Sequence, residues 1–274
     1  MLHALLRSSH PGPSIAVTII SAALAVGVGL GPLKVAIVTV MILCNQLSVG
    51  LSNDWLDAER DRRNGRRDKP IAGEEISPAT VATVAIVAAV SAIALSLTLG
   101  PLAAIAQALF LASGWLYNLG LKSTVISVVP YIVGFGALPA IVTLAADPPR
   151  LAHGWALAAG ALLGIAAHFS NVLPDLDDDS ATGVRGLPHR LGALTSGIII
   201  AVSLVAASTA IVFGPQADVT IVGLIGLTLG IVLALTSVVL VIRNTMKRIL
   251  FRITIAAALI NVALLLISAP RLSA

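Results

Sequence analysis

A cluster of acidic residues near the middle of the N-terminal half could bind a divalent cation. It contains Asn53, Asp54, Asp57 and Asp61, and residues 53, 57 and 61 recur at four-residue intervals. Residues three and four apart share one face of a helix, so a helix here would point several carboxylates in one direction. Carboxylates held so close together repel each other and resist ionisation. Mg²⁺ relieves that repulsion, and in proteins it binds a few carboxylates together with substrate phosphate oxygens.

A second cluster repeats this pattern. Asn171, Asp175 and Asp179 have the same four-residue spacing. Charged stretches are usually solvated loops, and this is our interpretation of the other acids nearby, which are Glu59, Asp68, Glu74, Glu75 and Asp177. Two copies of one stripe are hard to obtain by chance. We therefore predict a Mg²⁺ site whose ligands are Asp54, Asp57, Asp61, Asp175 and Asp179.

Basic residues accompany both clusters and could bind phosphate. Arg67 and Lys69 follow the first cluster, Arg185 follows the second, and Lys122 is the only charge in a short segment of its own. Arg and Lys are the usual partners of phosphate oxygens. Carboxylates for a metal and cations for phosphate together predict a diphosphate site. We expect Lys122 to be catalytic, and we expect substrate contacts from Asn53, Arg67, Lys69, Asn171 and Arg185.

The elements that must position these clusters are strongly apolar. The chain is 57% hydrophobic and 11% charged, with a mean hydropathy of +0.99, whereas about a quarter of a soluble domain is charged. An apolar segment of about 20 residues crosses the hydrocarbon core of a bilayer, and a helix satisfies its own backbone there. The sequence therefore predicts an all-α integral membrane protein with nine transmembrane helices. They lie at approximately 13–31, 33–52, 78–99, 101–118, 124–146, 153–173, 193–213, 219–241 and 251–269.

The distribution of charge predicts the orientation. With the N-terminus inside, 14 of the 17 Lys and Arg residues lie on the inner side, and only Lys34, Arg150 and Arg271 lie outside. Such a bias indicates an N-in, C-out topology in the cell (inner) membrane, and it explains the net charge of +4 without nucleic acid as a partner. Eleven of the 13 acids fall on the same side. We therefore expect the active site to face the cytoplasm.

The positions of the two clusters suggest an internal repeat. Each follows an even-numbered span, the second and the sixth, so four spans separate them. We predict a single domain, 1–274, made of two pseudo-repeated four-helix lobes plus one further helix. Its Asp-rich motifs would lie in cytoplasmic loops at 52–77 and 171–192.

Other polar residues have less specific interpretations. His168 precedes Asn171 by one turn, and we expect a buried, hydrogen-bonded structural histidine. His10 is interpreted as interfacial. Asn45 and Gln46 lie inside the second span, where they either line a cavity or bond between helices.

In these motifs the chain resembles the UbiA superfamily of intramembrane prenyltransferases. The family patterns NDxxDxxxD and DxxxD are met by Asn53, Asp54, Asp57 and Asp61, and by Asp175 and Asp179. The segment "DKPIAGEEIS" resembles the extension of the first motif. "LYNLGLKS" resembles the family's Tyr-plus-Lys segment, and "LRSSHPGPS" its N-terminal Arg-then-Pro entry into the first helix. The resemblance covers nearly the whole chain.

The resemblance implies a Mg²⁺-dependent transferase. A polyprenyl diphosphate would lie with its tail between helices open to membrane lipid, and the acceptor would be small, most often an aromatic ring of the quinone-precursor type. Arg7 and Tyr117 would contact substrate. The catalytic residues would be Asp57, Asp61, Asp175, Asp179 and Lys122.

Two alternatives stay open on the sequence. Within the superfamily, some members transfer a phosphoribosyl group to a polyprenyl phosphate. In a different class, intramembrane acids and internal repeats also occur in secondary transporters. Transporter sites, however, lie near the bilayer midplane, whereas these clusters lie at one end of their spans.

Overall fold

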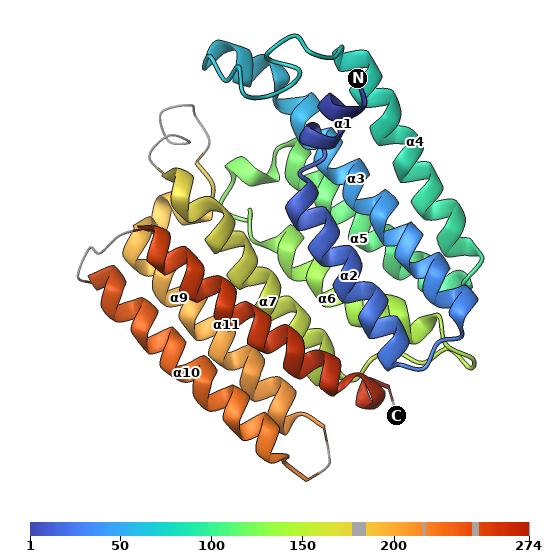
Figure 1. Cartoon of the computed structure of the whole chain (residues 1–274), viewed down its shortest axis with the longest axis vertical. Helices are drawn as coiled ribbons and strands as arrows, with labels where there is room; N and C mark the ends of the chain where they lie inside the picture. The colour runs from blue at the N-terminus through green and yellow to red at the C-terminus, as the bar shows by residue number, and fades with distance from the viewer. Residues whose placement is uncertain (177–184, 216–217, 243–246, 274) are drawn as a thin grey trace.

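The computed structural model describes residues 1–176, 185–215, 218–242 and 247–273, and these form helices without any strand (Figure 1). The α-helices are α1 (Leu2–Ser8), α2 (Pro11–Gly27), α3 (Pro32–Arg63), α4 (Pro78–Leu97), α5 (Pro101–Leu119), α6 (Val129–Leu144), α7 (Gly154–Val172), α9 (Leu187–Phe213), α10 (Ile221–Ile242) and α11 (Lys247–Ile267). Short 3₁₀ helices are η1 (Leu121–Ser123), η2 (Leu173–Asp175) and η3 (Ala269–Arg271).

Local sequence signals set the helix boundaries. Four helices begin with proline, at Pro11, Pro32, Pro78 and Pro101. Proline is favoured there because the first helical N–H has no intrahelical partner. Ser77 caps α4, its hydroxyl accepting a hydrogen bond from the Thr80 N–H at 3.1 Å. After α5, Gly120 adopts a φ of 147°, which favours glycine, and this turn leads directly into η1 and Lys122.

Each of the nine apolar segments predicted from the sequence overlaps one helix. By length and composition, six described helices could cross a membrane: α3, α4, α5, α7, α9 and Ile221–Leu240 of α10. The pair α1 and α2, which is bent by 73°, brings the number to seven if it counts as one span, while α6 and Arg252–Ile267 are shorter apolar helices. The structure confirms an all-helical protein with several candidate membrane spans, and nine crossings stay a prediction.

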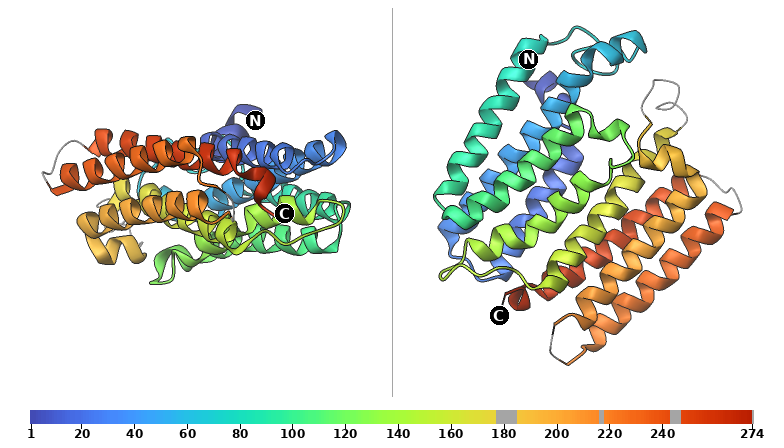
Figure 2. Two further views of the ribbon diagram at one scale, coloured as in Figure 1. Left: turned by 90° about the horizontal axis from the view of Figure 1, so that it is seen from below. Right: turned by 180° about the vertical axis from the view of Figure 1, so that it is seen from behind.

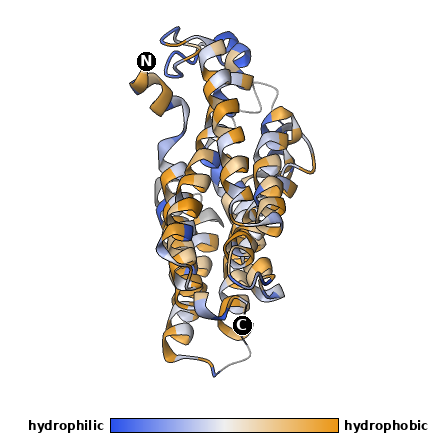
Figure 3. Cartoon of the chain, turned by 90° about the vertical axis from the view of Figure 1, so that its right-hand side faces the viewer, coloured by the Kyte–Doolittle hydropathy of each residue, from blue (hydrophilic) through white to orange (hydrophobic). Residues whose placement is uncertain are grey.

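The helices run side by side in a flattened bundle, with α4 at one edge and α10 at the other (Figures 1 and 2). The N-terminus lies at one end of the bundle and the C-terminus at the other (Figure 1). Apolar residues predominate along the helices (Figure 3). Many large ones face outward, for example Val87, Ile105, Leu235 and Leu259, as expected where the surroundings are lipid.

Close packing of α6 on α7 depends on two glycines. A Cβ at Gly160 would overlap the carbonyl oxygen of Phe135, and one at Gly164 would overlap that of Tyr131. Small residues let helix backbones approach closely. The two glycines therefore hold the stretch of α6 from Tyr131 to Phe135 against α7.

We predicted a loop at 52–77, but the first part of this segment is helical. Helix α3 continues to Arg63, so about three further turns follow the predicted end of the span at residue 52. Ion pairs within one helix face support this extension: Arg60 with Asp57 at 2.8 Å and Arg63 with Glu59 at 3.1 Å. The non-helical part begins at Asn64.

The second motif departs from the expected helical stripe. Helix α7 ends at Val172, and Leu173–Asp175 form a 3₁₀ turn. Pro174 explains the change, because proline lacks an N–H and its ring clashes with the carbonyl four residues earlier in an α-helix. Asn171 therefore lies on α7 whereas Asp175 follows it on a 3₁₀ turn. The side chain of Asp175 and all of Asp179 lie outside the described residues.

Candidate active site

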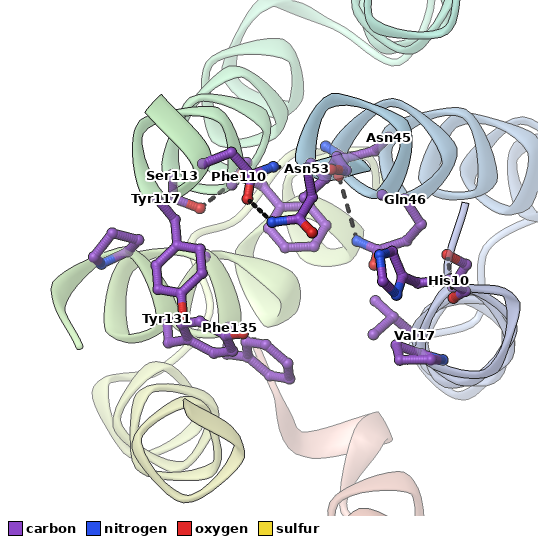
Figure 4. A pocket seen from close by; sticks show the side chains of 18 of the residues that line it. His10, Val17, Asn45, Gln46, Asn53, Phe110, Ser113, Tyr117, Tyr131 and Phe135 are labelled. Atoms are coloured by element: carbon purple, nitrogen blue, oxygen red, sulfur yellow. Dashed lines mark hydrogen bonds between the residues drawn. The ribbon is translucent and has the colours of Figure 1, made fainter. Parts of the chain in front are cut away.

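A cavity of about 260 Å³ lies among α2, α3, α5 and α6, and Asn171 of α7 also lines it (Figure 4). On α3 the lining runs from Asn45 to Asn53. The acidic motif continues directly from that point to Asp61. The cavity therefore ends at the charged cluster, where a ligand could place an anionic group among charges and the rest of its body inside the bundle.

Asp57 and Lys122 form the tightest ion pair at this end of the bundle. Lys122 Nζ donates to both carboxylate oxygens of Asp57, at 2.5 and 2.6 Å, and Arg60 donates to Asp57 Oδ2 at 2.8 Å. The side chains of Asp57 and Lys122 are 11% and 10% exposed. Burial lowers the pKa of the Lys122 ammonium below its ordinary value, and the charge of Asp57 opposes that shift. Lys122 thus contacts the first acidic motif through a carboxylate, and its role in catalysis stays a prediction.

Asp54 has a separate set of partners. Ser8 of α1 donates to Asp54 Oδ2 at 2.6 Å, and Lys69 Nζ lies 3.3 Å from Asp54 Oδ1. The side chain of Asp54 is fully buried, and Lys69 is 20% exposed. The N-terminal helix, the first motif and the following loop therefore meet at one carboxylate.

Asp61 is the carboxylate of the first motif that forms no ion pair within the described part of the chain. It is buried, and no Lys or Arg of the described residues lies within ion-pair distance of it. A buried charge without a partner is costly. Carboxylate oxygens are suitable ligands for a hard divalent cation. The chemistry of Asp54, Asp57 and Asp61 therefore fits such a cation.

These aspartates do not form a complete metal centre by themselves. Within the part of the chain that the structure describes, no three His, Cys, Asp or Glu residues form a group that could hold a metal ion. The remaining predicted ligands, Asp175 and Asp179, have side chains outside that part. The predicted five-carboxylate site therefore stays a prediction.

Asn53 is held by a hydrogen-bond network from α5. Its Nδ2 donates to Asn118 Oδ1 at 3.1 Å, and Asn118 Nδ2 in turn donates to Val49 O and Ser52 Oγ, both at 2.9 Å. One turn earlier, Trp115 Nε1 donates to Ser48 Oγ at 3.0 Å. Asn118 therefore fixes the carboxamide of Asn53 at the boundary between the cavity and the aspartates.

The N-terminal segment closes over this boundary. A Cβ at Gly50 would overlap the carbonyl oxygen of Ser9, so glycine permits the close approach of the chain to α3. His10 lines the cavity, and its Nε2 lies 3.4 Å from Lys69 Nζ. Burial, and then the charge of Lys69, lowers the pKa of the His10 imidazole. His10 therefore borders the cavity at the N-terminal end of α2, and its interpretation as an interfacial rather than a catalytic residue stays a prediction.

Aromatic rings form the wall that faces α3 across the cavity (Figure 4). Tyr117 and Tyr131 pack edge to face with centroids 5.2 Å apart, and Tyr131 stacks on Phe135 at 6.0 Å. His168 lies behind this wall, fully buried, with its Nε2 3.1 Å from Ser127 Oγ. His168 is thus a buried, hydrogen-bonded histidine, as expected.

Comparisons with known proteins identify the family of this chain. Residues 14–267 match the sequence profile of the UbiA prenyltransferase family. The chain belongs to the UbiA prenyltransferase family. No curated protein matches its sequence.

Solved structures with the UbiA fold are similar over almost the whole chain. A structure described as digeranylgeranylglyceryl phosphate synthase has a TM-score of 0.73 at 17% identity, covering 99% of each chain. A UbiA homologue from Archaeoglobus fulgidus bound to GPP and Mg²⁺ has a TM-score of 0.73 at 12% identity, covering 97% of this chain and 99% of its own. The apo UbiA homologue from Aeropyrum pernix K1 has a TM-score of 0.70 at 17% identity, covering 92% and 97%.

The structure places some of the predicted substrate-binding residues at the cavity and others away from it. Asn53, Tyr117 and Asn171 line the cavity. Arg7 instead pairs with Glu75 at 2.7 and 2.9 Å and also donates to the carbonyl oxygen of Asp68, so it ties α1 to the loop.

Two predicted phosphate-binding arginines lie at the surface. Arg67 and Arg185 are exposed and are not among the cavity-lining residues. The structure thus brings Lys69 and Lys122 to the aspartates, but it does not bring these arginines there.

Sequence reasoning missed Ser8 and Asn118. Asn118 is the neighbour of Tyr117 in "LYNLGLKS", and a carboxamide near the end of an apolar span could have indicated a role. Nothing local marks Ser8, because its contact with Asp54 joins residues 46 positions apart. For Asn45 and Gln46, the cavity-lining alternative is confirmed.

Proposed function

We propose that this prenyltransferase moves the prenyl group of a polyprenyl diphosphate to a small acceptor with the help of Mg²⁺. The observation that carries this proposal is the pairing of Lys122 with Asp57 next to a cavity among the helices. Similar proteins were solved with geranyl diphosphate (GPP) and Mg²⁺ and with dimethylallyl diphosphate (DMAPP) and Mg²⁺. A diphosphate would lie at the charged cluster and its tail within the apolar bundle.

Asp54, Asp57 and Asp61 would hold the metal together with Asp175 and Asp179 of the second motif. When bound, Mg²⁺ supplies electrostatic stabilisation of the diphosphate as it departs. Lys122 and Lys69 supply positive charge to the same group, in a low-dielectric setting that strengthens such contacts. Asn53, oriented by Asn118, contacts the substrate at the boundary.

The reaction breaks the allylic C–O bond of the donor, and diphosphate leaves with the bonding electrons. A new bond forms between the prenyl carbon and the acceptor, which gives up a proton. We propose an aromatic acceptor of the quinone-precursor type. The rings of Tyr117, Tyr131 and Phe135 support this choice, because aromatic faces stabilise a developing cation and stack on a flat acceptor.

We further propose nine membrane crossings with the N-terminus and the active site at the cytoplasmic face of the cell membrane. The charge bias along the sequence supports this orientation. Termini at opposite ends of the bundle (Figure 1) are consistent with an odd number of crossings.

The test uses the full chain in nanodiscs with GPP as donor. We expect Mg²⁺-dependent diphosphate release that stops in EDTA and falls at least about a hundredfold, on the order of 3 kcal/mol, in Asp57→Asn or Asp175→Asn. Full activity in EDTA or in either variant would disprove the metal site. Substrate counterflow in liposomes without diphosphate release would instead support a transporter, and transfer of a phosphoribosyl group to a polyprenyl phosphate would support the other superfamily activity.

A further inference from the structure

The described lining of the cavity forms two chemically different walls and includes no strongly charged residue. On α3, Gln46 and Asn53 present carboxamides, while Phe110, Tyr131 and Phe135 present rings from α5 and α6 (Figure 4). Among the described residues that line it, none is Asp, Glu, Lys or Arg. The charges gather beside the cavity, at Asp54, Asp57 and their cations.

Helix geometry orders these residues by depth. Asn53 lies next to the aspartates, and Gln46 precedes it by seven residues, which places it about 10 Å further into the bundle. Phe135 lies four residues beyond Tyr131 on α6, in the same direction, about 6 Å deeper. The deep end of the cavity therefore combines a carboxamide with an aromatic ring.

The hydrogen-bonding groups of the Gln46 carboxamide are only partly satisfied within the described part of the chain. Its Nε2 donates to Asn45 Oδ1 at 3.4 Å, a long contact, and no group of the described residues donates to Gln46 Oε1. Gln46 is partly exposed in the cavity wall. A prenyl tail cannot form a hydrogen bond, so packing it on this group would leave a polar atom unsatisfied, which is unfavourable. A hydroxyl group would satisfy it.

The lack of charge restricts the ligand further. A carboxylate placed deep in this cavity would meet no cation among the described lining residues, and burying an unpaired ion is far more costly than burying a neutral polar group. A flat neutral ring can stack on Phe135 and Tyr131 while its hydroxyl donates to Gln46 Oε1. The two walls therefore fit one kind of molecule.

We propose that the deep end of the cavity selects an uncharged hydroxylated aromatic acceptor and that Gln46 is a specificity-determining residue. This inference rests on the proposed prenyl transfer and names the acceptor class of that reaction.

The test compares two rings that differ by one carboxylate, naphthalene-1,4-diol and 1,4-dihydroxy-2-naphthoate. Binding of each is measured on the full chain in nanodiscs loaded with Mg²⁺ and the thiolo analogue of GPP. We expect the diol to bind at least about tenfold more tightly than the carboxylate, and Gln46→Leu to weaken diol binding by about tenfold. The affinity for the donor analogue should stay unchanged in Gln46→Leu. Gln46→Met provides a second, unbranched variant in case Gln46→Leu does not fold.

Gln107→Leu is the matched control. Gln107 is a fully buried carboxamide on α5 that does not line the cavity, so its loss should leave both ring affinities unchanged.

Several outcomes would overturn the inference. These are no diol binding to the loaded wild type, equal or tighter binding of the carboxylate, and unchanged diol binding in both Gln46 variants. Tighter donor binding in Gln46→Leu would assign the deep end to the prenyl tail. Failure of GPP itself to bind with Mg²⁺ is a separate result, measured without any ring, and would contradict the proposed transfer.

Discussion

Lys122 Nζ lies 2.5 and 2.6 Å from the two carboxylate oxygens of Asp57, although the residues are 65 positions apart in the chain. This contact joins η1 to α3 and places the only charge of its segment against the first acidic motif. Its consequence is that Asp57 already has a cation. A metal ion that bound Asp57 would compete with Lys122, which would then be able to contact a phosphate.

We expect Lys122→Ala to lower kcat at saturating donor by at least about tenfold, rather than only to raise KM. The reason is that the diphosphate gains charge as the C–O bond breaks, so the contact is strongest in the transition state. Steady-state kinetics with varied GPP measure both constants. An unchanged kcat with a raised KM would mean that Lys122 binds donor and transition state equally.

The same variant should bind a divalent cation more tightly when no donor is present. Lys122 competes with the metal for Asp57 and repels it, because both are positively charged. Removing Lys122 therefore removes both effects. Titration with Mn²⁺, followed by electron paramagnetic resonance, measures this affinity without turnover. Lys34→Ala is the control, because Lys34 forms a comparably short ion pair with Asp147, 2.6 Å, outside the motif. Weaker Mn²⁺ binding in Lys122→Ala would contradict the competition.

Asp61→Asn should reduce turnover strongly and yet stabilise the metal-free protein. Asp61 is buried and forms no ion pair with the described residues, so neutralising it removes a charge that the more distant Lys69 and Arg60 compensate only in part. Thermal unfolding in EDTA should show a raised Tm, and turnover with Mg²⁺ should fall about a hundredfold. A lowered Tm would indicate that the carboxylate has a stabilising partner.

Asn118→Ala should impair the reaction through Asn53. The variant removes the acceptor for Asn53 Nδ2 and the donor to Val49 O and Ser52 Oγ, so Asn53 loses its fixed orientation. We expect KM for GPP to rise and kcat to fall, with a loss of stability of about 1–3 kcal/mol. Asn118→Asp, which keeps an oxygen for Asn53 Nδ2, should recover part of the activity.

Asn261→Ala is the matched control for that experiment. Asn261 on α11 accepts from Ser208 Oγ at 3.0 Å and donates to Ala257 O at 3.1 Å, away from the cavity-lining residues. It should cost similar stability while turnover is unchanged. Equal losses of activity in both variants would reduce Asn118 to a structural role.

Gly164→Ala should displace the aromatic wall of the cavity, because Gly164 packs against the backbone of Tyr131. The added methyl group would overlap the carbonyl oxygen of Tyr131, so α6 must move away from α7 and carry Tyr131 with it. We expect a lower Tm, since overpacking typically costs about 1–3 kcal/mol, together with reduced turnover. Gly154→Ala, on the same helix with no atom within 4 Å of the new Cβ, should be neutral.

Much of the fold followed from composition and periodicity. The nine apolar segments each overlap a helix because length and hydrophobicity are local properties of the chain. The boundary of α3 was misplaced because the charged stretch after residue 52 is polar yet remains helical to Arg63. Polarity alone does not end a helix, and ion pairs four residues apart extend it.

The spacing of Asn53, Asp57 and Asp61 on one helix could likewise be predicted, because all three belong to one continuous helix. The stripe from Asn171 could not be extended in the same way, since Pro174 ends the α-helical register after Val172. This break is a local property of the chain, because Pro174 itself lies within the motif.

The sequence by itself determined the class of protein, the helices and the chemistry of the first motif, because each depends on residues that are close together in the chain. Only the tertiary structure decided which cation meets which carboxylate: Lys122 meets Asp57, Lys69 and Ser8 meet Asp54, and Asp61 meets none in the described part. It also decided that Gln46 and Phe135 share one cavity. These contacts depend on how helices pack, and packing is set by the shapes of side chains from distant segments, which no local pattern encodes.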